Sequence, residues 1–248
     1  MSRPHGIVPT SPLKDKVAKL KPNVFIAQPR RDASRPLIQV VYETDWVMTP
    51  FACRTRYGST NGLDISTARN QLMHYALNSG AEYIWFVDDD TVVPYYGFQK
   101  LYYAAKMLGH PVVGGVVTQK LIDPPLPMTA CLKDDRVFIP DLSYADELAD
   151  VNWLTGFACL MIHVVVLKRM LAENPDEPFC WFQVGADGAV ECGEDMWFCH
   201  RCFNLDIPIK VHRGVQCRHY DLATMRYWGG HSGSKYYLNK DGKPVLSP

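Results

Sequence analysis

The chain has 248 residues, 47% of them hydrophobic and 21% charged, so it can bury a sizeable core. Its 26 Lys and Arg balance its 26 Asp and Glu, which excludes the strong overall attraction to nucleic acid or anionic membranes that a basic protein has. The first 22 residues lack the apolar core of a signal peptide, and the most apolar stretch, residues 155–171, is interrupted by His163 and two basic residues. We therefore expect a soluble, cytoplasmic protein without a membrane span.

Short apolar runs alternate with helical patterns from residue 23 onward. Runs typical of strands occur at 23–27, 37–42, 83–87, 111–118, 156–162, 207–211 and 215–221. Apolar side chains recur at helical spacing in residues 64–80, 94–109, 164–172 and 194–205. Capping residues at Asp64 to Thr67 open the first of these helices, and Gly80 follows it. This alternation predicts an α/β fold.

The remaining segments divide the chain into three parts. Residues 1–22, rich in Pro, Ser and Lys, are expected to form an N-terminal tail, residues 23–221 one domain, and residues 222–248 a C-terminal extension. Irregular structure is expected at about 120–150, which contains the sequence DPPLP. Hairpins are expected at 181–192 and 235–246, because both contain Gly-bearing turn sequences.

Three consecutive carboxylates, Asp88, Asp89 and Asp90, follow the apolar run at 83–87. Ligands of open α/β sheets bind beyond the carboxyl ends of strands, where this triplet lies. Side chains alternate in an extended segment, so we expect Asp88 and Asp90 on one side and Asp89 on the other. Such a carboxylate pair suits Mg²⁺ or Mn²⁺, which also bind water and phosphate oxygens. The alternative is a solvated acidic turn in which Asp90 caps the next helix.

Eight cysteines without a secretion signal indicate reduced thiols rather than disulfides. A structural zinc site is an open alternative, although a second C-x-x-C is missing. Its candidate ligands are Cys192, Cys199, Cys202 and Cys217. Cys199 and Cys202 fall on the apolar face expected for the helix at 194–205, with Met196 and Phe203, which favours buried free thiols.

Several motifs occur in a set order along the chain. They are ARNQLMHYALNSGAEYIWFVDDD at 68–90, VVGGVV at 112–117, WLTGFACLMIHVVVLKRM at 153–170, GEDMWFCHRC at 193–202 and VQCRHYD at 215–221. In this order they resemble the GT-A fold glycosyltransferases, especially the family 2-like group with D-x-D and xED motifs. The resemblance covers roughly residues 23–221. It implies a GT-A (Rossmann-like) α/β fold with a mixed, mainly parallel sheet flanked by helices. It also implies sugar transfer from a nucleotide-diphosphate-sugar to an acceptor hydroxyl, with inversion at the sugar carbon.

The same resemblance assigns roles to individual residues. Asp90 and His219 would be ligands of a Mn²⁺ or Mg²⁺ ion bridging the donor diphosphate, with Asp88 on the ribose or beside the metal. The nucleotide-sugar side would comprise Pro29, Arg69, Asn70, Asp88 and Asp89, and the acceptor side Trp153 and Gly156. Asp195 would be the general base, kept ionised by the helix dipole, with Glu194 beside it to bind acceptor or orient the base.

Each assignment has an ordinary structural alternative. Glu194 and Asp195 suit the first turn of any helix, and His219 suits a hydrogen-bonded structural histidine. Trp153 and Gly156 suit core and close-packing positions. The family's nucleotide-contacting acid after the second strand has no confident counterpart, and the Q-x-x-R-W signature of processive synthases is absent.

Two other functions remain open on sequence grounds. A nucleotidyltransferase also uses paired metal carboxylates, but residues 27–36 carry arginines and no glycines to hold a triphosphate. A non-catalytic sugar-nucleotide-binding protein is the second alternative. The expected partners are a nucleotide-sugar, a UDP-sugar being commonest in the resembling family, and an acceptor. The acceptor classes that remain open are a glycan, a lipid-linked sugar, a protein and a modified nucleic-acid base. The sequence does not indicate an oligomeric state.

Overall fold

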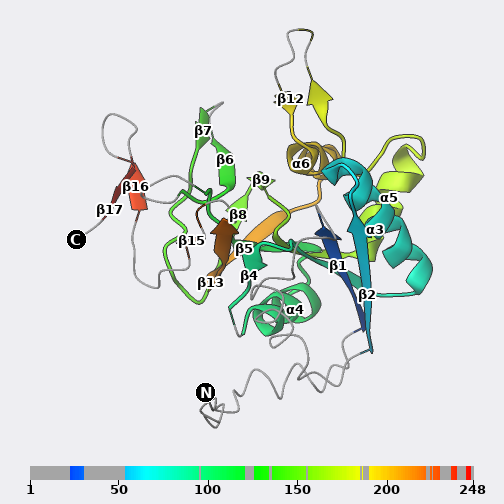
Figure 1. The fold of residues 1–248 in the computed structure, drawn as a ribbon, viewed down its shortest axis with the longest axis horizontal. Helices are drawn as coiled ribbons and strands as arrows, with labels where there is room; N and C mark the ends of the chain where they lie inside the picture. The colour runs from blue at the N-terminus through cyan, green and yellow to red at the C-terminus, as the bar shows by residue number, and fades with distance from the viewer. Residues whose placement is uncertain are drawn as a thin grey trace.

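A computed structural model of the chain has the expected α/β fold, built on a large central sheet (Figure 1). The structure describes residues 23–30, 54–94, 96–120, 126–133, 136–154, 156–184, 186, 190–221, 224, 226–229, 236–238 and 244–246. The tail expected at 1–22 and the strand expected at 37–42 lie outside the described residues. Nowhere in the described chain is a helix long and apolar enough to cross a membrane.

Among the described residues, the central sheet has seven strands in the order β2-β1-β3-β10-β5-β13-β8. They are β1 (Asn23–Arg30), β2 (Arg54–Asn61), β3 (Tyr83–Val87), β5 (Val112–Val116), β8 (Leu148–Val151), β10 (Cys159–His163) and β13 (Ile209–Gln216). β10 and β8 run antiparallel to their neighbours, and the other strands share one direction. The sheet is therefore mixed and mainly parallel. The carboxyl ends of β3, β5 and β13 point to one edge, where open α/β sheets bind ligands.

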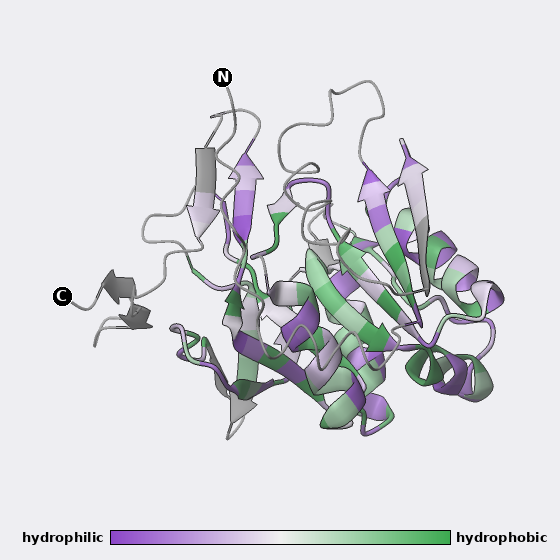
Figure 2. Ribbon diagram, turned by 90° about the horizontal axis from the view of Figure 1, so that it is seen from below, coloured by the Kyte–Doolittle hydropathy of each residue, from purple (hydrophilic) through white to green (hydrophobic). Residues whose placement is uncertain are grey.

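Two hydrophobic cores cover the two faces of the sheet. Phe86 of β3 packs in the core beneath α3 (Ile65–Ser79), α5 (Val164–Glu173) and α6 (Glu194–Asn204). Its neighbour Trp85 packs in the core beneath α4 (Gly97–Met107). Every side chain of β3 is buried, which explains why the strand reads as an unbroken apolar run. Figure 2 shows the same pattern, with hydrophobic residues concentrated in the central strands.

The ends of the helices test the capping predictions. The Asp64 carboxylate accepts a hydrogen bond from the Thr67 amide at 3.0 Å, and Gly80 ends α3 with a left-handed φ of 71°. Both predictions are confirmed. α4 begins after Tyr96, which makes no side-chain capping bond. The alternative in which Asp90 caps this helix is therefore wrong.

Shorter strands form several small sheets outside the central one. They are β4 (Thr91–Val92), β6 (Thr129–Lys133), β7 (Arg136–Phe138), β9 (Trp153–Leu154), β11 (Gln183–Val184), β12 (Val190–Cys192), β14 (Arg218–Asp221), β15 (Arg226–Gly229), β16 (Tyr236–Leu238) and β17 (Pro244–Leu246). The pairs β11·β12 and β16·β17 confirm the two expected hairpins.

The irregular structure expected at about 120–150 is wrong in part. β6 and β7 form a hairpin there, and β8 adds an edge strand to the central sheet. These strands have no clear alternation of apolar residues, and they are stabilised by strand pairing instead: β6 with β7 and β9, and β8 with β13.

The cysteines of α6 lie in the core, as favoured from the sequence. Cys199 and Cys202 are fully buried free thiols. Phe198 shares their face, whereas Met196 and Phe203 are 36% and 61% exposed. The expected grouping of those last two residues with the cysteines is therefore wrong, because they project from the other side of the helix.

Candidate active site

The Asp triplet lies at a tight turn beyond the carboxyl end of β3. The strand ends at Val87, and the amide of Thr91 donates to the carbonyl of Asp88 at 3.1 Å. Asp89 and Asp90 are the two central residues of this turn. The expected strand-like alternation of the three side chains is therefore wrong, because the backbone reverses direction. The turn directs Asp88 and Asp90 to different partners.

Asp88 is held by a buried arginine of α3. Arg69 is 3% exposed, and its Nη1 and Nη2 each lie 3.1 Å from a different oxygen of Asp88. Its Nε donates to Glu194 Oε1 at 3.2 Å. The guanidinium also stacks on the ring of Phe157, 4.8 Å from the centroid. One guanidinium thus connects α3, the end of β3 and the start of α6.

The charge balance around Arg69 keeps it protonated. Burial alone lowers its pKa, but the carboxylates of Asp88 and Glu194 outweigh burial and raise the pKa above its ordinary value. Asp88 and Glu194 are 20% and 12% exposed in their side chains. This triad is therefore a partly desolvated ion cluster, and removing one member leaves a charge unpaired.

Asp90 faces the opposite side of the turn and pairs with two other groups. His219 Nε2 lies 3.3 Å from its Oδ1, and Lys120 Nζ lies 2.5 Å from its Oδ2. The backbone is held as well, since the amide of Tyr220 donates to the Asp90 carbonyl at 2.7 Å. Burial opposes ionisation, but His219 and Lys120 lower the pKa of Asp90 to about 2. Asp90 is therefore a carboxylate throughout the physiological range.

The position of His219 follows from strand pairing. β14 pairs antiparallel with β4, which places His219 opposite Thr91. Its Nδ1 lies 3.0 Å from the carbonyl of Thr118. A carbonyl only accepts hydrogen bonds, so Nδ1 carries the hydrogen and Nε2 is directed at Asp90.

Asp90 and His219 are suited to a divalent cation, and Asp88 is less so. One ion can contact both Asp90 Oδ1 and His219 Nε2, and the bond from Nδ1 to Thr118 resembles the support that metal-binding histidines receive. Both oxygens of Asp88 are engaged by Arg69. Within the described residues, no group of three or more His, Cys, Asp and Glu side chains is placed to hold a metal. A cation here would therefore take its remaining ligands from water and phosphate, as Mg²⁺ commonly does.

Asp195 lies in the first turn of α6, beside Glu194. Its Oδ1 accepts a hydrogen bond from the Met196 amide at 2.7 Å. Burial raises the pKa of Asp195, and the nearby Glu194 raises it further, to about 6. Burial and the like charge of Glu194 therefore outweigh the groups that lower the pKa of Asp195. The group is still ionised at neutral pH, and it accepts protons more readily than an ordinary aspartate.

Gly193 precedes this pair and fits closely against it. A Cβ atom on Gly193 would lie 2.8 Å from Asp195 Oδ1, closer than such atoms approach. The backbone φ of −76° is open to any residue, so a side chain at this position would be accommodated only by displacing the Asp195 carboxylate. Sequence reasoning placed Gly193 in a motif but did not recognise this role.

The other expected nucleotide-side residues have structural partners. The Asn70 side chain makes two hydrogen bonds to the backbone of Cys180, at 2.7 and 3.0 Å. Pro29 is buried near the carboxyl end of β1 and pairs with Thr60 of β2. Asn70 therefore positions the segment before β11, and Pro29 lies at the same edge of the sheet as the Asp turn.

The expected acceptor-side residues lie beside the central sheet. Trp153 of β9 is partly buried and packs against the core that contains α6. A Cβ on Gly156 would lie 3.1 Å from Met128 Cε. Both contacts fit packing roles, and an acceptor role for these two residues stays a prediction.

Sequence reasoning missed Lys120, the third member of the Asp90 cluster. It follows β5 by four residues and belongs to none of the quoted motifs. Its position in the sequence could have identified it, because Lys120 follows β5, and the carboxyl end of β5 lies at the edge of the sheet where ligands bind.

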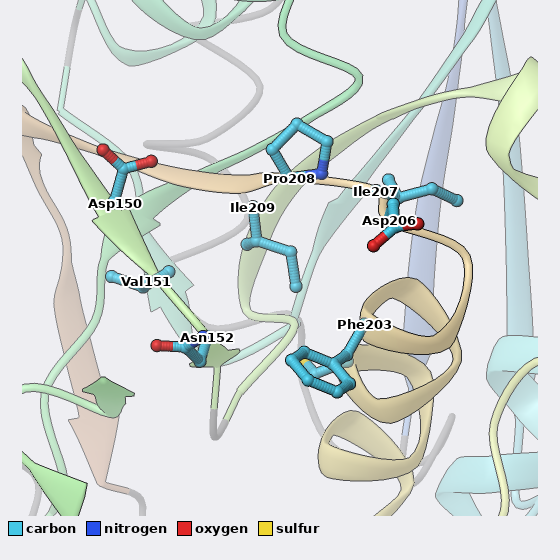
Figure 3. A pocket seen from close by; sticks show the side chains of 9 residues that line it. Asp150, Val151, Asn152, Phe203, Asp206, Ile207, Pro208 and Ile209 are labelled. Carbon is cyan, nitrogen blue, oxygen red and sulfur yellow. The ribbon is translucent and has the colours of Figure 1, made fainter. Parts of the chain in front are cut away.

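A cavity of about 450 Å³ lies at the other end of α6 (Figure 3). It is lined by Phe203 and Asp206 from the end of α6, by Asp150 to Asn152 from the region of β8, and by Ile207 to Ile209. Asp195 is at the first turn of the same helix, so this cavity is separate from the carboxylate cluster.

Comparison with known proteins establishes the fold. The crystal structure of A197 from STIV is similar with a TM-score of 0.50 and 18% identity, covering 91% of this chain and 94% of that chain. S. aureus TarS 1–349 in complex with UDP-GlcNAc is similar with a TM-score of 0.44 and 12% identity, over 76% of this chain and 55% of that one. Apo UDP-glucose pyrophosphorylase has a TM-score of 0.39 and 7% identity, over 90% and 78%. No protein-family model and no curated protein matches the sequence.

Proposed function

We propose that this chain is a metal-dependent glycosyltransferase that moves a sugar from a nucleotide-diphosphate-sugar, of which a UDP-sugar is the first candidate, to an acceptor hydroxyl. The observation that carries the proposal is the Arg69 bridge. It joins Asp88 of the D-x-D turn to Glu194 of the E-D pair, two motifs that are over 100 residues apart in the sequence. A donor-side acid cluster and a candidate base therefore meet at the binding edge of the sheet.

The donor side is assigned to the Asp turn. Asp90 and His219 would hold Mn²⁺ or Mg²⁺, and that ion would stabilise the negative charge that forms on the departing diphosphate. The Arg69 guanidinium fixes the orientation of Asp88, and Asp88 is then available at the edge of the turn for a ribose hydroxyl. Asp89, also in the turn, and Pro29, at the end of β1, complete the expected nucleotide side.

The chemical step is assigned to Asp195. The acceptor oxygen attacks the anomeric carbon, and its proton passes to the Asp195 carboxylate. A new carbon–oxygen bond forms as the bond to the diphosphate oxygen breaks, and the electron pair leaves with the nucleotide diphosphate. Attack from the face opposite the leaving group inverts the anomeric configuration. Glu194 is bound to Arg69, so we assign it to orienting the site and to raising the basicity of Asp195.

The acceptor side is assigned to the start of the β11–β12 hairpin, in addition to Trp153 and Gly156. Gln183 pairs with Cys192, three residues before Asp195. Trp181 and Phe182 come directly before Gln183 and are 51% and 42% exposed. Residues 181–192 contain no Lys or Arg, so they offer no counter-charge to a phosphate-bearing acceptor. Exposed aromatic rings beside a carboxylate favour an uncharged sugar ring as acceptor.

Purified protein tested against a panel of nucleotide-sugars, with and without Mn²⁺, decides the function. We expect one UDP-sugar to raise the melting temperature only with metal, and slow release of UDP with water as acceptor. Asp90→Asn is expected to abolish the metal-dependent shift, whereas Asp150→Asn, at an 83% exposed side chain on the sheet, is expected to leave it unchanged. Formation of UTP and sugar 1-phosphate on addition of pyrophosphate, instead of release of UDP, would favour a nucleotidyltransferase, and no metal-dependent binding of any nucleotide-sugar would overturn the proposal.

A further inference from the structure

Lys120 pairs with Asp90, the carboxylate that is proposed to bind the divalent metal ion. Its Nζ is 2.5 Å from Asp90 Oδ2, while His219 occupies the side of Oδ1. Both oxygens of the proposed metal-binding carboxylate are therefore already engaged. The backbone of Asp90 is hydrogen-bonded to the Tyr220 amide, which fixes the position of its Cα beside these two partners.

This ion pair is less exposed than two other Lys–acid pairs of the described chain, and it resembles the pair of Lys106 with Glu82, whose side chains are 35% and 31% exposed. Lys210 pairs with Asp150, whose side chain is 83% exposed, and Lys100 with Asp146, which is 71% exposed. Exposed pairs of this kind contribute little and depend on salt. The side chains of Lys120 and Asp90 are only 25% and 29% exposed, so their interaction is less screened. Lys120 is thus, beside His219, one of the two partners that stabilise the charge of a partly desolvated carboxylate.

Lys120 at Asp90 Oδ2 opposes a second cation at Oδ1. A divalent ion bound between Asp90 and His219 would lie within a few ångströms of the Lys120 ammonium and would repel it. A lysine has a flexible four-carbon stem, and Lys120 is partly exposed, so the ammonium can move away. A phosphate oxygen of a bound nucleotide diphosphate would give it a new partner at the same edge of the sheet.

We infer that the Lys120 ammonium and the divalent cation bind the Asp90 carboxylate alternately. Lys120 therefore weakens metal binding until a nucleotide diphosphate is present. This inference rests on the proposed function. The ammonium neutralises Asp90 in the protein without ligand. When the nucleotide diphosphate brings the metal, the ammonium moves to the phosphates. Metal and nucleotide therefore bind cooperatively, and the coupling has the same size whichever binds first.

Binding of Mn²⁺ in the absence of nucleotide tests the inference directly. Free Mn²⁺ would be measured by electron paramagnetic resonance during titration of the wild-type protein, Lys120→Met, Lys120→Arg and the control Lys210→Met. Lys120→Met keeps the apolar stem and removes the charge, so we expect about tenfold tighter Mn²⁺ binding. Lys120→Arg and Lys210→Met are expected to match the wild type. Saturating UDP is expected to tighten Mn²⁺ binding by the wild type and to remove most of its difference from Lys120→Met.

The outcomes separate the two proposals. Equal or weaker nucleotide-free Mn²⁺ binding by folded Lys120→Met overturns the role of Lys120, while wild-type binding of Mn²⁺ with UDP leaves the proposed function standing. Failure of every variant to bind Mn²⁺, with or without UDP, overturns both. Melting curves of the variants show whether each one is folded, and Lys120→Gln serves as a second neutral variant if Lys120→Met does not fold.

Discussion

The guanidinium of Arg69 and the carboxylate of Asp88 form a two-pronged ion pair, with both N–O distances at 3.1 Å. Arg69 is almost completely buried, and its remaining Nε reaches Glu194. A planar guanidinium can make this set of contacts and an ammonium cannot. The pair therefore determines how the end of β3 is oriented relative to α6.

We expect Arg69→Lys to abolish nucleotide-sugar binding and to lower the free energy of unfolding by up to about 3 kcal/mol, because one carboxylate loses its partner. Arg201→Lys is the matched control. Arg201 is also buried, and it donates to the backbone carbonyls of Met170, Glu177 and Pro178 and pairs with the Glu177 carboxylate, outside the Asp88–Glu194 cluster. This control is expected to lose stability while retaining binding, measured by calorimetry below both melting temperatures. Normal binding by Arg69→Lys would contradict the role of the ion pair.

The pH dependence of transfer should report the ionisation of Asp195. The carboxylate form accepts the proton, so kcat/KM is expected to rise with pH through about 6 and to level off above it. Glu194 raises the pKa of Asp195, so Glu194→Gln is expected to move this limb to lower pH. Asp195→Asn is expected to bind donor and to lose transfer. A flat profile between about pH 5 and 8, or near-normal turnover by Asp195→Asn, would exclude Asp195 as the base.

The same group is expected to make stability depend on pH. The folded-state pKa of about 6 exceeds the ordinary value of 3.8, so the native state binds more protons than the unfolded state between these values. The free energy of unfolding therefore falls as pH rises through this window, and the full cost of about 1–3 kcal/mol is present above pH 6. We expect Asp195→Asn to melt at a higher temperature than the wild type above pH 6 and to match it below pH 4. Identical melting curves at pH 8 would contradict the burial of this charge.

Gly193→Ala tests the placement of Asp195 without changing its chemistry. The backbone conformation accepts alanine, but the added Cβ would displace the Asp195 carboxylate from its hydrogen bond with Met196. We expect kcat to fall at least tenfold, with donor affinity and melting temperature close to those of the wild type. Gly114→Ala is the control, because a Cβ on Gly114 of β5 would make only ordinary contacts at 3.6 Å, and this variant is expected to keep its kcat. Unchanged turnover by Gly193→Ala would contradict the proposed geometry.

Trp181→Ala tests the acceptor side of the proposal. Because Trp181 is half exposed, its removal is expected to cost little stability. We expect the KM for a sugar acceptor to rise about tenfold while metal-dependent donor binding is unchanged, and Trp181→Phe to recover most of the loss. Equal KM values for the wild type and Trp181→Ala would place the acceptor elsewhere, with Trp153 the next residue to substitute.

Much of the architecture could be predicted because its signals are local. The apolar run of β3, the cap at Asp64 and the glycine after α3 each follow from a few consecutive residues, and the structure contains all three. The strands β6, β7 and β8 were not predicted, because they lack apolar periodicity; β7 pairs with the adjacent β6, whereas β6 and β8 also pair with the more distant β9 and β13.

The sequence by itself determined that this chain forms an α/β sheet and that an acidic cluster follows one of its buried strands, because strand periodicity and the position of a strand end are properties of neighbouring residues. Only the tertiary structure decided which partner each acid takes. Arg69 engages Asp88, Lys120 and His219 engage Asp90, and burial beside Glu194 raises the pKa of Asp195. The ion pairs of Asp88 and Asp90 join residues 19 to 129 positions apart, and the strength of all these interactions depends on desolvation, which exists only once the chain has folded.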